Sequence, residues 1–159
     1  MNVKRILKAA VAVLVCAAVA AFVCPRSVER KLNRADEVLI KAGGGFSDKK
    51  VKEVTIRKGS EAFEELKQIV KPYTYHPTFA TLIRHTTVTG SIRDDVTIYM
   101  FDESGKQFFN VHALGKQKTW IDDTSYHMGY GGDETAQRFA EDISAFAERH
   151  AADGTENNS

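Results

Sequence analysis

Histidine and carboxylate side chains in the second half of the chain are the residues that can do chemistry. His112, Asp122 and His127 supply the imidazole and carboxylate groups that bind zinc or transfer protons. No tight ligand motif such as His-Glu-x-x-His occurs, and the adjacent acids Asp122 and Asp123 point to opposite faces of a strand. A small envelope hydrolase or metal-dependent enzyme that uses the first three residues is therefore the second hypothesis. No metal or cofactor is predicted.

Aromatic residues gather in the same part of the chain and form the first hypothesis. The candidate binding residues are Tyr99, Phe108, His112, Trp120, Tyr126 and Tyr130. Aromatic walls with a few polar groups are typical of sites that bury and orient a ligand. The alternative is a second core layer, because apolar patches of this size usually need a cover. We expect a binding or interaction module without catalytic activity, whose ligand is a protein or a small molecule.

A hairpin positions most of these aromatic residues. Residues 96–101 and 107–113 alternate apolar and polar side chains around a turn at 102–105. An even loop places the apolar residues of both strands on one face, whereas an odd loop mixes apolar and polar residues on both faces. We predict the even loop, which leaves the aromatic candidates of these strands on the opposite face.

Further strands and two helices complete the predicted domain. Three more segments have the composition of strands: residues 52–58, 79–89 and 118–122. One helix is capped by Ser60 and ends before Pro72, and a second is capped by Asp133. Each helix has one apolar face that needs a sheet to cover, and short links favour antiparallel strands. The prediction is an α+β fold with about five antiparallel strands packed by two amphipathic helices.

The amino-terminal segment predicts a membrane address. Residues 6–24 are apolar apart from one lysine and follow Lys4 and Arg5. This pattern is typical of a secretory signal, and its length also reaches the roughly 17-residue lower limit of a transmembrane helix. We predict that residues 1–25 are a signal peptide or a membrane anchor, with a single pass and the domain outside the cytoplasm. The alternative is secretion after cleavage near Ala20.

Charge and glycine content predict how the remainder is divided. Residues 26–58 hold twice as many basic as acidic residues, and the acidic remainder argues against nucleic-acid binding. Residues 26–45 are predicted to be a basic stalk, helical over 27–40, that ends at a glycine hinge. A basic stretch of this kind can attract anionic lipid head groups, and the equally favoured alternative is an ordinary solvated face. Residues 46–150 form the predicted domain and 151–159 a disordered tail.

The sequence Trp120-Ile121-Asp122 is followed by Tyr126, Gly129-Tyr130 and an amphipathic helix. With the order of elements, it resembles small uncharacterised membrane-anchored or lipoprotein-like extracytoplasmic domains of bacteria, over about residues 51–148. The resemblance implies a strand and a helix followed by an antiparallel sheet and a final helix. It supplies no catalytic residues. The chain departs from lipidated members at Cys24, which lacks the small preceding residues that lipid attachment requires.

Overall fold

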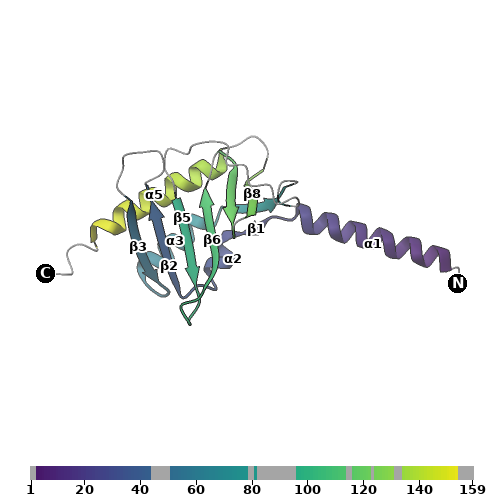
Figure 1. Cartoon of the computed structure of the whole chain (residues 1–159), viewed down its shortest axis with the longest axis horizontal. Helices are drawn as coiled ribbons and strands as arrows, with labels where there is room; N and C mark the ends of the chain where they lie inside the picture. Colours follow the sequence, from purple (N-terminus) through teal and green to yellow (C-terminus); the bar gives the residue numbers. More distant parts are fainter. Residues whose placement is uncertain are drawn as a thin grey trace.

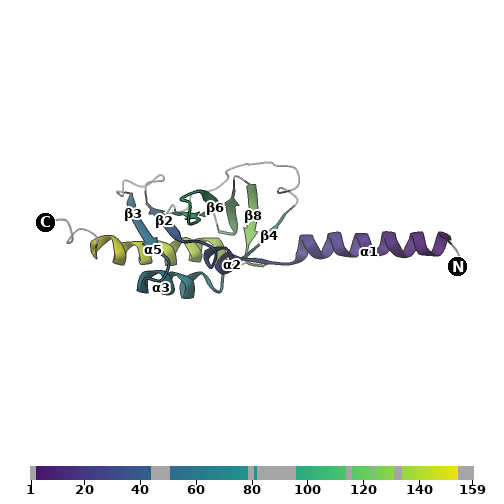
Figure 2. The same cartoon turned by 90° about the horizontal axis from the view of Figure 1, so that it is seen from below.

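The computed structural model contains an antiparallel sheet with two amphipathic helices on one face (Figures 1 and 2). The structure describes residues 3–43, 51–78, 81, 96–113, 116–122, 124–130 and 134–153. We call the face that carries the helices the inner face and the opposite one the outer face. This arrangement leaves the outer face uncovered by either helix.

The described sheet has eight strands in the order β1-β4-β8-β7-β6-β5-β2-β3, so the prediction of about five strands is wrong. The strands are β1 (Arg26–Ser27), β2 (Glu37–Ala42), β3 (Lys52–Arg57), β4 (Thr74–Pro77), β5 (Val96–Phe101), β6 (Gln107–Ala113), β7 (Lys118–Ile121) and β8 (Thr124–Met128). Three of the extra strands, β1, β4 and β8, are short and polar. With two, four and five residues, they are too short for alternation to identify a strand in a sequence.

The predicted helix over residues 27–40 is wrong beyond Leu32. Helix α2 spans Val28–Leu32, and the next residues form β2, which lies between β3 and β5 inside the sheet. Val38 and Ile40 are fully buried on the inner face. The segment predicted as a stalk therefore supplies β1, α2 and β2. The consecutive apolar residues of β2 suit a strand as well as a helix, and pairing on both edges decides between them.

The two amphipathic helices follow the predicted pattern. Helix α3 (Glu61–Val70) begins at the cap Ser60, whose hydroxyl accepts a hydrogen bond from the Phe63 backbone N–H at 3.2 Å. Helix α5 (Thr135–Asp153) crosses the inner face and packs against β2, β3, β5, β6 and β8. Its buried apolar residues are the predicted stripe, Ala136, Phe139, Ala140, Ile143, Phe146 and Ala147. Burial of the apolar face of α5 against the sheet, and of that of α3 against α5, α2 and β3, forms the core.

The register of the β5–β6 hairpin confirms the predicted faces, but the prediction of an even loop is wrong. Phe101 lies opposite Gln107, so residues 102–106 link the strands, and a register shift between Met100 and Phe101 offsets this odd number. Ile98 lies opposite Val111, and Met100 lies opposite Phe109. All four side chains are buried on the inner face. At the turn, the Asp102 carboxylate accepts hydrogen bonds from the backbone N–H of Ser104 and of Lys106, both at 3.0 Å. The hairpin thus holds Tyr99 and His112 on the outer face.

Helix α1 (Val3–Val23) projects away from the sheet, at the end opposite to the last turn of α5 (Figures 1 and 2). Among the residues that the structure describes, none of the helices has the length and apolarity needed to cross a membrane. This finding corrects the predicted transmembrane helix.

Several predicted features lie outside the described residues. Apart from Thr81, the strand predicted over residues 79–89 is one of them, and the cap at Asp133 is another. The carboxyl-terminal tail is described only to Asp153, where α5 ends.

Candidate functional site

A row of partly buried aromatic and histidine side chains crosses the outer face. Tyr99 on β5 lies opposite Asn110 on β6. His112 is the next residue of β6 on the same face, two positions after Asn110. His112 in turn lies opposite Trp120 on β7, with ring centroids 6.5 Å apart and the planes near perpendicular. We call Tyr99, His112 and Trp120 the aromatic centre. The three residues come from three adjacent strands, so the sheet itself brings together the predicted binding residues of β5, β6 and β7.

Ion-paired residues border the aromatic centre on the side of β2 and β3. The Lys41 ammonium lies 2.7 Å from a carboxylate oxygen of Glu53, and the Arg57 guanidinium lies 3.5 Å from that of Glu37. The hydrogen bond to Glu53 raises the pKa of Lys41 above its ordinary value. Exposed pairs of this kind contribute little to folding. They make this edge of the outer face polar and charged.

Two histidines border the aromatic centre on its other side. His127 on β8 lies opposite His76 on β4, with ring centroids 5.8 Å apart. The His76 ring also stacks on Tyr130 at 4.7 Å, with the planes 8° apart. Burial lowers the pKa of His127, and the charges of His76 and Lys118 lower it further. His127 is therefore neutral at physiological pH and can become charged as the pH falls.

This lowered pKa predicts a pH-dependent stability. Because folding weakens His127 as a base, the unfolded chain binds more protons than the folded chain once the pH falls below about 6.5. The contribution of neutral His127 to folding stability is therefore complete above about pH 6.5. It is lost as the pH falls toward the lower pKa that His127 has in the folded chain. We expect the wild type to lose more stability than His127→Gln between about pH 7.5 and about pH 5.5 in urea unfolding. Equal losses in both proteins would contradict the prediction.

Two predicted binding residues have other surroundings. Tyr126 on β8 has the opposite parity to His127 and packs edge-on against the buried Tyr75, with ring centroids 5.4 Å apart. Phe108 shares the outer-face parity of His112, but it packs against the core and under the Arg34 guanidinium at 5.6 Å. Tyr126 therefore lies away from the aromatic centre. Phe108 also lies outside it, because its ring contacts Arg34 near the turn of the hairpin.

The structure does not bring together His112, Asp122 and His127, the residues of the second hypothesis. The two histidines lie on β6 and β8, which β7 separates, so their backbones are about 10 Å apart across the sheet. Asp122 lies in the turn after β7 with a positive φ of 47°, and its carboxylate accepts the Asn110 backbone N–H at 3.1 Å. Within the described part of the chain, no group of three His, Cys, Asp or Glu side chains can hold a metal ion.

Sequence reasoning missed His76, because it did not recognise β4. The signal was present but short: Tyr75 is buried and the next residue faces the other side, within four residues that end at Pro77. Proline is tolerated at Pro77 because β1 pairs only with Thr74 and Tyr75, but four residues rarely identify a strand without tertiary context.

Comparisons with known proteins give no family for this chain. No family model matches it, and neither a curated protein nor a solved structure matches it. The geometry of the site is therefore the basis for assigning a function.

Proposed function

We propose that this chain is a non-enzymatic binding module of the bacterial cell envelope, and that its aromatic centre contacts a partner protein. The observation that carries the proposal is the placement of both amphipathic helices on the inner face (Figure 2). Tyr99, His112 and Trp120 are consequently only partly buried, although they lie in the middle strands of the sheet.

The surroundings of the aromatic centre support a protein partner. Tyrosine and tryptophan are enriched in the cores of protein interfaces, and such cores are surrounded by a polar rim. On the outer face, the pairs Lys41–Glu53 and Arg57–Glu37 lie along one side of the aromatic centre. An aromatic core with charged residues beside it has the composition of an interface and places its polar groups at the margin, where they stay hydrated.

The envelope location rests on the amino-terminal sequence. Basic residues followed by the apolar residues 6–24 favour export and a contact with the membrane. In this proposal the domain functions outside the cytoplasm, either held at the membrane or released after cleavage near Ala20. Intact mass and membrane partitioning of the native protein distinguish these two forms.

Site-specific photocrosslinking tests the interface. A photoreactive phenylalanine analogue replaces Trp120 in the full chain, expressed in its native cells, and a matched control places it at the exposed Glu61 on α3, on the helical side of the sheet. We expect one discrete adduct from position 120 and none from position 61. Tyr99→Ala in the same chain is expected to weaken the adduct, because interface aromatic residues contribute about 2 kcal/mol or more to binding, roughly thirtyfold in affinity.

Two results would overturn this proposal. One is the absence of an adduct at position 120, and the other is the same adduct at both positions. Thermal unfolding of each variant checks that the domain is intact. We expect it to stay folded, because the substituted side chains lie outside the inner core.

A further inference from the structure

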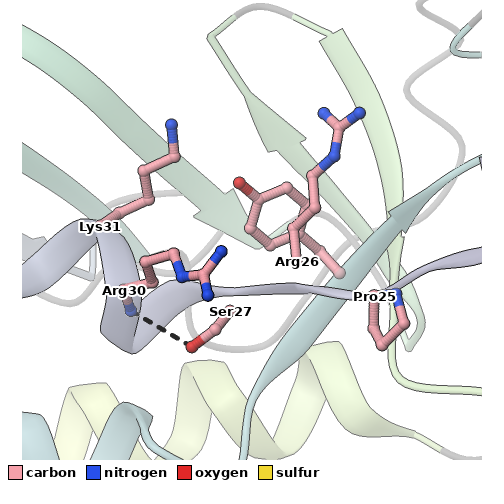
Figure 3. Close-up of a pocket in the computed structure, with 6 residues that line it drawn as sticks. Pro25, Arg26, Ser27, Arg30 and Lys31 are labelled. Carbon is pink, nitrogen blue, oxygen red and sulfur yellow. Dashed lines mark hydrogen bonds between the residues drawn. The ribbon is translucent and has the colours of Figure 1, made fainter. Parts of the chain in front are cut away.

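A basic pocket lies where the chain passes from α1 into the sheet (Figure 3). Its volume is about 460 Å³, within the range of small-molecule sites. The pocket is lined by Pro25, Arg26, Ser27, Arg30, Lys31 and Tyr75. The sequence alone had assigned most of these residues to a stalk.

Secondary structure holds the basic residues of this pocket in place. Arg26 on β1 lies opposite Tyr75 on β4. Ser27 caps α2, and its hydroxyl accepts the Arg30 backbone N–H at 3.2 Å (Figure 3). Lys31 follows on the same short helix, and its ammonium lies 4.9 Å from the Phe109 ring centroid. Two elements that are anchored in the fold therefore present three cations to one pocket.

The charge of the pocket is not balanced by carboxylates. Among the described residues that line it, none is acidic. Of the ion pairs between described residues, none involves Arg26, Arg30 or Lys31, whereas Lys41, Lys52 and Lys58 each have an acidic partner. Contacts with aromatic rings stabilise a cation without neutralising it. Three cations held around one cavity repel one another, so an anion bound there would be stabilised by all three.

Tyr75 adds a hydrogen-bond donor to the wall of the basic pocket. Its side chain is buried, with 2% of its surface exposed. Burial raises the pKa of Tyr75 to about 12, so the hydroxyl keeps its proton at physiological pH. Guanidinium groups bind phosphate oxygens through paired hydrogen bonds, and lysine binds them as a point charge. The donors of this pocket therefore suit a phosphate group better than a neutral ligand.

We infer that the basic pocket binds a phosphate group, carried by an anionic lipid head group or by a soluble phosphate ester. Its position favours the lipid. Only Cys24 separates Pro25 from the end of α1. Apolar side chains of that helix such as Val13 and Leu14 are 68% and 69% exposed. If α1 contacts a membrane, the basic pocket lies next to the head groups, where basic residues attract anionic lipids. This inference does not depend on the aromatic centre.

Vesicle binding by the full chain tests the inference. The probes are vesicles of phosphatidylcholine alone and of equal parts phosphatidylcholine and phosphatidylglycerol. We expect wild type to prefer the anionic vesicles and Arg26→Gln with Arg30→Gln to bind them about thirtyfold more weakly, since each basic residue near the surface contributes about fivefold. The matched control, Lys52→Gln with Arg57→Gln, removes the same charge from β3 at the far edge of the sheet and is expected to keep the preference.

Calorimetric titration with glycerol phosphate and with inorganic phosphate distinguishes the two sources. If phosphate titration releases heat that the pocket variant abolishes, and the wild type shows no preference for anionic vesicles, the site binds a soluble phosphate. An equal loss of vesicle binding in the control variant would overturn the inference, because net charge would then explain it. So would the absence of both vesicle preference and phosphate binding. Arg30→Gln alone, at an exposed position with only a backbone bond to Ser27, serves if the double variant fails to fold.

Discussion

Replacing Phe109 with alanine is expected to lower the free energy of unfolding by about 3–5 kcal/mol. Phe109 lies on the inner face of β6, opposite Met100, and only 1% of its surface is exposed. Its removal leaves a cavity that neighbouring side chains on a rigid sheet cannot fill. A domain of this size is stabilised by only about 5–15 kcal/mol, so this single change removes a large part of the total. Urea unfolding measures the loss.

The adjacent phenylalanine is the matched control. Phe108→Ala removes the same side chain one residue away, on the opposite parity, where the ring is partly buried beside Arg34. We expect a clearly smaller loss than at Phe109. Equal losses would contradict the register of the hairpin, because a slip by one residue exchanges the two faces of a strand.

Replacing Ile40 with alanine is expected to cost about 2–5 kcal/mol of folding free energy. Ile40 is fully buried in β2, between Val54 on β3 and Ile98 on β5. A strand paired on both edges cannot move to fill the cavity. Thermal or urea unfolding of the full chain provides the measurement. A large loss indicates that residues 37–42 form a central strand, and no loss indicates a stalk outside the domain.

Leu39→Ala is the control for Ile40→Ala. Leu39 points to the outer face beside Tyr99 and is only partly buried, so its truncation is expected to cost less. If residues 37–42 were a stalk, both substitutions would leave the unfolding transition unchanged. That outcome would remove β2 from the core of the domain.

Local signals explain why the helices and the hairpin were predictable. The cap at Ser60 and the apolar stripe of α5 act over a few residues each, and both are present in the structure. The faces of β5 and β6 also follow from neighbouring residues, since the apolar side chains of both strands must share one face. The structure achieves this with an odd loop and a register shift at the end of β5, not with the predicted even loop. In each case the physical cause lies within about ten residues of its effect.

The missing strands depend on distant partners. β1 has two residues and pairs with β4, which lies nearly 50 positions later in the chain. β4 in turn pairs with β8, which brings His76 beside His127. Such short segments gain their hydrogen bonds only when the rest of the sheet is formed, so their local pattern is too short to identify them.

The two candidate sites also differ in how far the sequence predicts them. The sequence by itself determined that Tyr99 and His112 share a face, because alternation along the strands of one hairpin requires it. Only the tertiary structure decided that both amphipathic helices pack on the other face and that Arg26 and Arg30 converge on one pocket with Tyr75. The reason is physical: parity is a property of adjacent residues, whereas the choice of which face is covered depends on contacts between elements far apart in the chain.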